Sequence, residues 1–324
     1  AGSRFLNGTL DSHIALEKRL AEFAGKEDAI IFSTGFQVNL GVISCLLGRE
    51  DYIIWDSLNH ASIIEGIRLS PAKSLRFKHN DMAALERRLQ QCDPERIKLI
   101  VVDGVFSMEG DLCNLPEICR LAEQYKASVM VDEAHGFGVM GDHGRGVCNY
   151  FGLTDKVDLI MGTFSKSFAA IGGFIAGSKT TINYIRHHAR SYIFSASCTP
   201  AATAAVGKSL EIMLREPERV EALQEKTRYC LEKFRKLGFE IGHTSTPIIP
   251  LFVRDNEKTF RVTAELFHEG VFVNPVVAPA VAPEDTLIRF SLMATHTYEQ
   301  LDTAIEKITA VFRRLDIPLH PQQD

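Results

Sequence analysis

Short apolar runs and longer amphipathic stretches alternate along most of the chain. Segments of four to six residues that contain three or four consecutive apolar residues are typical of strands that are buried on both faces of a sheet. They occur at residues 29–32, 52–55, 98–103, 129–132 and 158–161. Between these runs, apolar residues recur every three or four positions, which predicts amphipathic helices. The alternation favours an α/β fold with a mostly parallel sheet that helices cover on both faces.

The last third of the chain has a different pattern. The apolar runs at residues 248–253, 271–273 and 287–292 predict three strands, and helices are predicted near 259–269 and 297–314. Strands and helices in this arrangement are typical of a small α+β domain. We therefore expect a large domain over residues 1–212 and a smaller C-terminal domain over residues 213–324.

Composition narrows the class of protein. A net charge of −5 and an isoelectric point near 6.2 give no basic surface for nucleic acid. No apolar run approaches the roughly 20 residues of a membrane span, although peripheral membrane contact stays open. The seven cysteines form no C-x-x-C pair and no spacing typical of a metal site. This usage predicts reduced thiols in a cytoplasmic protein that has no metal centre.

One lysine follows a predicted buried strand and is surrounded by small hydroxyl residues. The strand ends near Met161, and the next residues read Gly-Thr-Phe-Ser-Lys-Ser, with the lysine at position 166. By itself, Ser-Lys-Ser is more often part of a solvated loop. However, a second predicted strand delivers Asp132 and His135 upstream of Lys166. Because ligands bind beyond the carboxyl ends of parallel strands, these three side chains are expected to converge, as a Schiff-base lysine for pyridoxal phosphate (PLP) requires.

Three further positions are candidates for binding. A small-residue turn at Gly35 begins a predicted helix, where free backbone N–H groups attract anions, although most such turns are ordinary helix starts. His60 follows another strand end, where it could stack on a flat ring or simply cap a helix. Arg289 lies within an apolar strand, where it is expected to bind a carboxylate or to form an internal ion pair.

Three segments, in this order, carry a family resemblance: Asp132-Glu133-Ala134-His135, Gly162-Thr163-Phe164-Ser165-Lys166 and Met293-Ala294-Thr295-His296-Thr297. From Ser3 to about Val311 the chain resembles the α-oxoamine synthases. These PLP enzymes have the aspartate-aminotransferase fold, or PLP fold type I. Residues 270–275 and 288–293 are most similar to the bacterial branch that condenses L-serine with palmitoyl-CoA. The function expected from the resemblance is therefore a decarboxylating condensation that yields 3-ketodihydrosphingosine, CoA and carbon dioxide.

The resemblance implies catalytic roles for four residues. Lys166 is expected to bind PLP as a Schiff base and to take the α-proton of the amino acid. Asp132 is expected to face the pyridine nitrogen, His60 to stack on the ring and contact the substrate, and His135 to hydrogen-bond the ring oxygen.

It also implies a set of binding residues. Those expected to hold the cofactor are Gly35, Phe36, Ser107, Thr163, Ser165, Ser195 and Thr199. Within this set, the backbone at Gly35 and Phe36 is expected to bind the phosphate, and Ser195 and Thr199 to reach the phosphate of a neighbouring subunit. Arg289 matches the arginine that binds the carboxylate of the substrate or intermediate. A homodimer with shared active sites follows from the same resemblance.

Several alternatives remain open at this point. Sister enzymes of the family use alanine to make 8-amino-7-oxononanoate or glycine to make 2-amino-3-ketobutyrate, and these substrates differ from serine by one small group. Another PLP enzyme of the same fold, such as an aminotransferase or a lyase, is a second alternative. A non-catalytic subunit is disfavoured because Lys166, Asp132 and His60 are all present.

Overall fold

The computed structural model describes residues 2–320, which divide into two compact units. The large unit comprises residues 2–106 and 113–217, and the small unit comprises residues 107–112 and 218–320. The domain boundary expected near residue 212 stays a prediction.

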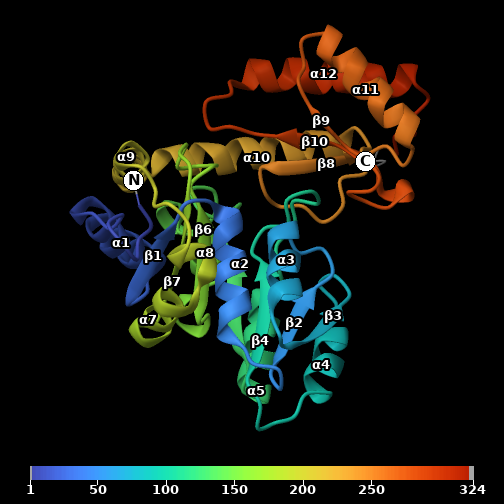
Figure 1. The fold of residues 1–324 in the computed structure, drawn as a ribbon. Coiled ribbons are helices and arrows are strands. Elements are labelled where there is room, and N and C mark those ends of the chain that lie inside the picture. Colours follow the sequence, from blue (N-terminus) through green and yellow to red (C-terminus); the bar gives the residue numbers. More distant parts are fainter. Residues whose placement is uncertain (1, 321–324) are drawn as a thin grey trace. The chain divides into compact units, whose positions relative to one another are not determined.

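A seven-stranded sheet forms the centre of the large unit (Figure 1). Its strands follow the order β1-β7-β6-β5-β4-β2-β3, and β7 alone runs antiparallel to its neighbours. The strands are β1 (Asp28–Phe32), β2 (Tyr52–Asp56), β3 (Lys73–Phe77), β4 (Lys98–Asp103), β5 (Ser128–Asp132), β6 (Leu159–Thr163) and β7 (Gly173–Gly177). The expected mostly parallel sheet is thus confirmed.

Helices connect these strands, and their ends follow local sequence signals. Gly25 ends the first helix in the left-handed conformation (φ 65°), and the Thr199 side chain accepts a hydrogen bond from Ala202 N–H ahead of Pro200. The helices are α1 (Asp11–Ala24), α2 (Gly35–Leu46), α3 (Ala61–Leu69), α4 (Met82–Gln90), α5 (Leu115–Tyr125), α6 (Gly146–Tyr150), α7 (Lys179–His188), α8 (Arg190–Ile193) and α9 (Pro200–Arg215). Short 3-10 turns occupy Asp142–Gly144 and Thr154–Lys156.

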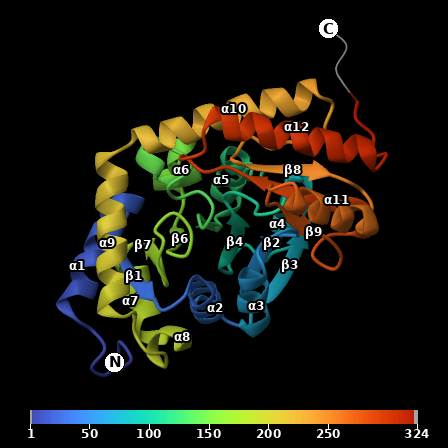
Figure 2. The same ribbon diagram turned by 90° about the horizontal axis from the view of Figure 1, so that it is seen from above.

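Helices cover both faces of the sheet. Figure 2 shows α2 and α3 on one side of the strands and α5 and α6 on the other. The side of α2 and α3 forms a buried core with alternate strand residues, among them Ile53, Leu99 and Val101. The intervening residues Ile100 and Val102 are also fully buried, as expected for strands with two covered faces.

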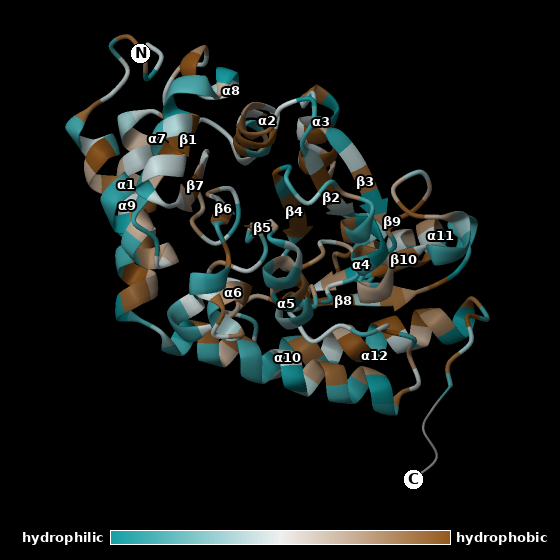
Figure 3. Ribbon diagram, turned by 90° about the horizontal axis from the view of Figure 1, so that it is seen from below, coloured by the Kyte–Doolittle hydropathy of each residue, from teal (hydrophilic) through white to brown (hydrophobic). Residues whose placement is uncertain are grey.

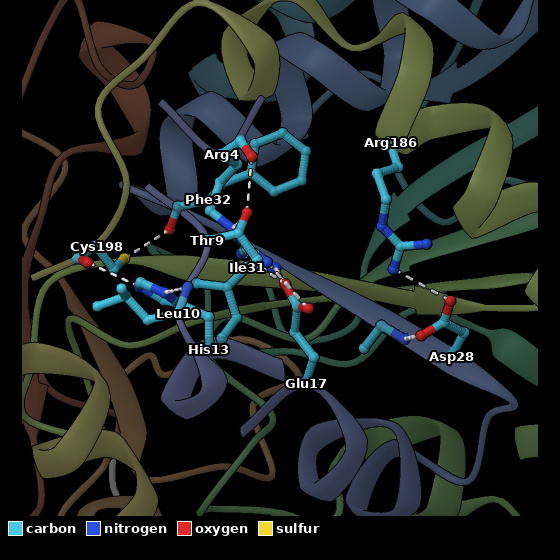
Figure 4. Close-up of polar contacts among 11 residues, drawn as sticks. Arg4, Thr9, Leu10, His13, Glu17, Asp28, Ile31, Phe32, Arg186 and Cys198 are labelled. Atoms are coloured by element: carbon cyan, nitrogen blue, oxygen red, sulfur yellow. Dashed lines mark hydrogen bonds and ion pairs between the residues drawn. The ribbon is translucent and has the colours of Figure 1, made fainter. Parts of the chain in front are cut away.

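A buried polar network fastens the first residues of the large unit to β1 (Figure 4). Two nitrogens of Arg4 donate to the Glu17 carboxylate, at 2.7 and 3.2 Å, and Glu17 Oε1 also accepts from the backbone N–H of Ile31 at 2.9 Å. His13, which is fully buried, lies 2.8 Å from the backbone oxygen of Cys198. These contacts join α1 to β1 and to the segment that precedes α9.

The small unit contains a three-stranded antiparallel sheet and three long helices. Its strands, in the order β8-β10-β9, are β8 (Ile248–Phe252), β9 (Asn274–Val276) and β10 (Leu287–Ser291). The helices are α10 (Glu218–Lys236), α11 (Asn256–His268) and α12 (Tyr298–Arg314), and a 3-10 turn spans Pro283–Asp285. Figure 3 shows hydrophobic and hydrophilic residues interleaved along α10 and α12. Phe234 of α10 and Phe312 of α12 belong to a buried aromatic cluster that also contains Phe239 and Phe290.

The strand expected at residues 271–273 is wrong in position. Val271 N–H donates to Leu266 O at 2.8 Å and so completes the end of α11, where Gly270 takes a positive φ of 82°. The strand begins at Asn274, which pairs with Arg289 of β10. The apolar residues 271–273 therefore lead from the helix to the sheet without joining it.

The segment 107–112 belongs to the small unit although it is distant from it in sequence. The hydroxyl groups of Thr244 and Thr246 donate to the backbone oxygen of Gly110 at 2.9 and 2.7 Å. Gly110 has a positive φ of 69°, and a Cβ at this position would lie 2.0 Å from the backbone oxygen of Ile248. Only glycine fits this turn. Within residues 2–320, no helix is long and apolar enough to cross a membrane.

Candidate active site

The candidate residues of the large unit follow the carboxyl ends of parallel strands. Strands β1, β2, β4, β5 and β6 all run in one direction, so their carboxyl ends lie at the same edge of the sheet. Gly35 follows β1, His60 follows β2, Asp132 ends β5 and Lys166 follows β6. This edge is where ligands bind in open α/β sheets.

The loop that carries Lys166 is held by two buried aromatic rings. Phe164 and Phe168 lie on either side of the lysine and contact each other at 5.6 Å between ring centroids. Ser167 Oγ donates to the backbone oxygen of Phe137 at 2.8 Å, and Phe164 N–H donates to Gly172 O at 2.9 Å. Lys166 itself is exposed between these anchors. The fold thus fixes the backbone of the loop and leaves the Lys166 side chain at the surface.

Asp132 is a buried carboxylate with two neutral donors. Asn39 Nδ2 donates to its Oδ2 at 2.8 Å and Ala134 N–H donates to its Oδ1 at 2.9 Å. Asp103, its register partner on β4, is also buried. Burial and the charge of Asp132 raise the pKa of Asp103 well above its ordinary value, although the backbone N–H of His60 and the Lys166 charge oppose this shift. The edge of the sheet therefore favours one negative charge, not two.

His60 caps α3 and lies within the electrostatic range of both Asp132 and Lys166. Its backbone N–H donates to Asp103 Oδ2 at 2.9 Å, and its Nδ1 accepts from Ser62 N–H at 3.2 Å. Burial lowers the pKa of His60 below its ordinary value; Asp132 opposes this shift and Lys166 adds to it. The imidazole is therefore neutral at neutral pH, as suits a group that stacks on a flat ring.

The turn before α2 is packed against the end of β6. A Cβ on Gly35 would lie 2.5 Å from Thr163 Oγ1, which itself lies 3.1 Å from Ser165 Oγ. Gln37 Nε2 donates to Ser195 Oγ at 3.1 Å. The structure thus gathers Gly35, Thr163, Ser165 and Ser195 around the N-terminus of α2. Phe36 is the second residue of that helix and is exposed.

Two other predicted residues have clear places in the large unit. His135 lies three positions after Asp132 in the turn that follows β5 and is half-buried. Thr199 is the capping residue of α9, and its side chain is engaged by Ala202 N–H at 3.3 Å. Neither position by itself assigns a ligand to these residues.

Ser107 and Arg289 lie together in the small unit. Arg289 Nε donates to the backbone oxygen of Ser107 at 2.7 Å, and its Nη1 donates to Ser291 Oγ at 2.7 Å. Burial lowers the pKa of Arg289. No carboxylate among residues 2–320 forms an ion pair with this guanidinium, so the internal ion pair that the sequence left open is absent from the described part of the chain.

Sequence reasoning missed four polar residues around the site: Asn39, Ser62, Asp103 and Glu133. The last two were detectable in principle, because Asp103 ends an apolar strand as Asp132 does, and Glu133 follows Asp132 directly. Asn39 and Ser62 are helix residues that only the packing of α2 against α3 brings together. No spacing rule indicates such a contact.

Comparison with known proteins gives the family. The model of aminotransferase class I and II matches residues 1–308. The chain belongs to this family. It is 65% identical over 317 residues to a serine palmitoyltransferase of Bacteroides thetaiotaomicron, covering 98% of this chain and 80% of the relative. It is 46% identical over 314 residues to an 8-amino-7-oxononanoate synthase of Bacillus pumilus, covering 97% and 80%.

Solved structures agree with this assignment. A serine palmitoyltransferase from S. paucimobilis, solved with a bound PLP-myriocin aldimine, matches with a TM-score of 0.94 and 36% identity over 98% of this chain and 80% of that one. An 8-amino-7-oxononanoate synthase from Francisella tularensis matches with a TM-score of 0.84 and 27% identity, covering 98% and 90%. The resemblance to the α-oxoamine synthases and the fold type expected from the sequence are confirmed.

Proposed function

We propose that this chain is a PLP-dependent acyltransferase that condenses L-serine with palmitoyl-CoA. The products are 3-ketodihydrosphingosine, CoA and carbon dioxide, and the step is the first of sphingolipid synthesis. The single observation that carries the proposal is the 65% identity to a serine palmitoyltransferase over nearly the whole chain. The residues at the sheet edge supply the chemical groups that such a reaction needs.

The residues present fit PLP by their chemistry. The cofactor carries an aldehyde, a ring nitrogen, a ring oxygen and an anionic phosphate. The site offers an exposed lysine at position 166, a buried carboxylate on Asp132 and a neutral imidazole on His60. The turn at Gly35 has no room for a Cβ and opens onto the N-terminus of α2, which suits an anion.

Each of these groups is assigned one role. Gly35 and Phe36 bind the phosphate through their backbone, and Thr163 and Ser165 extend the same cradle. His135 donates to the ring oxygen, and His60 covers one face of the ring. Ser107 adds a further contact to the cofactor. These assignments rest on the family resemblance together with the chemistry of the side chains.

PLP, when bound, supplies an electron sink for the pair of electrons left on the amino acid when its α-proton is removed. Asp132 stabilises a positive charge at the ring nitrogen, which a buried carboxylate does strongly because little water screens it. Lys166 would hold the cofactor through its Nζ, and the same amine, when free, would take the α-proton of serine. His60 blocks one face, so that the proton leaves from the other.

Arg289 binds the carboxylate of serine. Its planar guanidinium can form two parallel hydrogen bonds to a carboxylate, and in the small unit only neutral oxygens engage it. Burial makes the isolated charge costly, and an incoming carboxylate relieves that cost. An arginine kept without an acidic partner is the expected state of a substrate-binding arginine.

We also propose a homodimer with shared active sites and a cytoplasmic location. Ser195 and Thr199 are assigned to the phosphate of the neighbouring subunit. The apolar side chain of Phe194, next to Ser195 in the sequence, is 73% exposed. All seven cysteines are free thiols, which suits a reducing compartment. Analytical ultracentrifugation of the PLP-loaded protein tests the dimer.

The decisive experiment is CoA release by the PLP-loaded protein with palmitoyl-CoA and either L-serine, L-alanine or glycine. Release with serine alone supports the proposal. Release only with alanine or glycine, or only with a shorter acyl donor, transfers the assignment to a sister enzyme such as 8-amino-7-oxononanoate synthase. Lys166→Ala is the matched control, and it should bind PLP non-covalently and release no CoA with any pair.

A further inference from the structure

Two buried helix residues connect Asp132 to His60. Asn39 in α2 is fully buried and Ser62 in α3 is 2% exposed. Asn39 Nδ2 lies 2.8 Å from Asp132 Oδ2 and also 2.8 Å from Ser62 Oγ. Ser62 Oγ in turn lies 2.8 Å from His60 Nδ1. A continuous chain of hydrogen bonds therefore runs from the carboxylate to the imidazole.

The chemistry of the donors fixes the direction of each bond. A carboxylate only accepts, so the Asn39 amide must present its two N–H groups to Asp132 and Ser62. The Ser62 hydroxyl accepts one of them and is left to donate to His60 Nδ1. The backbone N–H of Ser62 also points at Nδ1, at 3.2 Å. Because two donors face Nδ1, this nitrogen carries no proton and the imidazole keeps its proton on Nε2.

Tight packing of α2 against α3 holds these hydrogen-bonded side chains in place. A Cβ added to Gly66 of α3 would lie 2.7 Å from the backbone oxygen of Asn39 and 3.1 Å from Ile43. The two helices therefore approach closely at the level of Asn39. Neither polar side chain can swing away into solvent, because both are buried. The hydrogen bonds thus have one arrangement.

We propose that Asn39 and Ser62 are positioning residues that orient the Asp132 carboxylate and the His60 imidazole as one unit and keep the proton of His60 on Nε2. This inference deepens the proposed function, on which it rests. The amide of Asn39 thus fixes the orientation of both the Asp132 carboxylate and, through Ser62, the His60 imidazole. A change at Asn39 should therefore disturb both groups, whereas a change at Ser62 should disturb His60 alone.

The test is nitrogen NMR of the PLP-loaded protein labelled with ¹⁵N-histidine, without substrate. The two ring nitrogens of a neutral imidazole give separate signals that reveal which one carries the proton. His60→Gln identifies the signals of His60 among those of the 11 histidines. We expect Nε2–H in the wild type and a measurable fraction of Nδ1–H in Ser62→Ala and in Asn39→Ala. A proton on Nδ1 in the wild type, or unchanged His60 signals in both variants, would overturn the proposal.

Kinetics separate positioning from a general loss of stability. Each single variant should lower kcat/KM for serine about tenfold, the usual effect of one lost buried hydrogen bond. The double variant should have nearly the same kcat/KM as each single variant, because both residues act through the same series of hydrogen bonds. A hundredfold loss of kcat/KM would mean that the two residues act independently. Thr227→Ala is the control, since its hydroxyl is equally buried but donates to Leu223 O within α10.

That control should be less stable and yet leave the His60 signals and kcat/KM unchanged. If Asn39→Ala does not fold, Ser62→Ala alone carries the test. A different result is also informative. If the variants move the His60 proton from Nε2 to Nδ1 but the wild-type protein releases no CoA with serine, the positioning role of Asn39 and Ser62 is supported and the proposed function is refuted. The NMR spectrum therefore tests the positioning role, and the CoA assay tests the proposed function, independently of each other.

Discussion

Asp103 and Asp132 are direct partners across β4 and β5, and both carboxyl groups are buried. They differ in their hydrogen bonds, because Asp132 accepts from the side chain of Asn39 and from Ala134 N–H, whereas Asp103 accepts from the backbone N–H of His60. Burial, and after it the charge of Asp132, raise the pKa of Asp103 well above its ordinary value, so that Asp103 favours its neutral form. Two chemically identical residues at one edge therefore have different electrostatic environments.

Asp132→Asn should slow removal of the α-proton of serine. An ion pair at about 4 Å is worth about 4 kcal/mol at an effective dielectric of about 20, or roughly a thousandfold in rate. The measurement is exchange of the serine α-proton in D₂O, followed by ¹H NMR with the PLP-loaded protein. Asp103→Asn is the control, because it resembles the neutral form that Asp103 favours. Equal effects in the two variants would contradict the roles assigned here.

Gly35→Ala should weaken PLP binding while leaving the fold intact. The new Cβ would lie 2.5 Å from Thr163 Oγ1 and 2.9 Å from its Cβ, closer than van der Waals contact allows, so the turn must move away from β6. We expect at least a tenfold rise in the Kd for PLP, measured by titration of the cofactor. Gly48→Ala is the control, since its nearest atom would be 3.4 Å away. An unchanged Kd in Gly35→Ala would remove this turn from the phosphate site.

Arg289→Lys should raise the KM for serine about tenfold or more and change PLP binding little. Lysine keeps the positive charge but lacks the planar fork that binds a carboxylate through two hydrogen bonds. The measurement is CoA release at varied serine concentration, together with a PLP titration. Ser291→Ala removes only a neutral partner of the guanidinium and should change KM less than Arg289→Lys does. A loss of kcat at constant KM would argue for a different role of Arg289.

The sequence was informative wherever chemistry coincided with the end of a strand. Lys166, Asp132 and His60 each follow or end an apolar run, and parallel strands bring such positions to one edge. Helix residues gave no such signal, because the contact of Asn39 with Ser62 depends on how α2 and α3 are rotated and how closely they pack. The apolar pattern also predicted a strand at residues 271–273, where none forms. Val271 instead completes the end of α11 after Gly270, so the strand begins only at Asn274.

Glu17→Ala should destabilise the large unit strongly. The substitution would leave the Arg4 guanidinium, only 8% exposed, without its carboxylate and would free the backbone N–H of Ile31 (Figure 4). Breaking a buried ion pair in this way costs about 3–5 kcal/mol. Urea unfolding measures the change. Glu50→Ala breaks a solvent-exposed pair with Lys73 and should change the free energy of unfolding far less, because water already screens that pair. Similar losses in both variants would mean that burial does not govern the Arg4 pair.

The raised pKa of Glu133 predicts that the protein becomes less stable as the pH rises. The Glu133 side chain is fully buried, and its Oε1 accepts from Cys148 N–H at 2.7 Å, whereas its Oε2 has no partner among the described residues. Burial raises the pKa of Glu133 to about 7 from the ordinary 4.5, although the backbone N–H groups of Val147 and Cys148 oppose the shift. The folded protein therefore holds this proton over a pH range in which the unfolded chain has already released it.

The sign follows from proton linkage. Between about pH 4.5 and 7 the folded state binds more protons than the unfolded state, so the free energy of unfolding falls as the pH rises. The full contribution is present below pH 4.5 and is lost by about pH 7 to 8, and a shift of this size amounts to about 3 kcal/mol. Glu133→Gln cannot titrate, so the variant should gain up to that amount relative to the wild type between pH 5 and 8. Parallel urea unfolding curves across this range measure the difference, and a constant difference would show that Glu133 is ionised throughout.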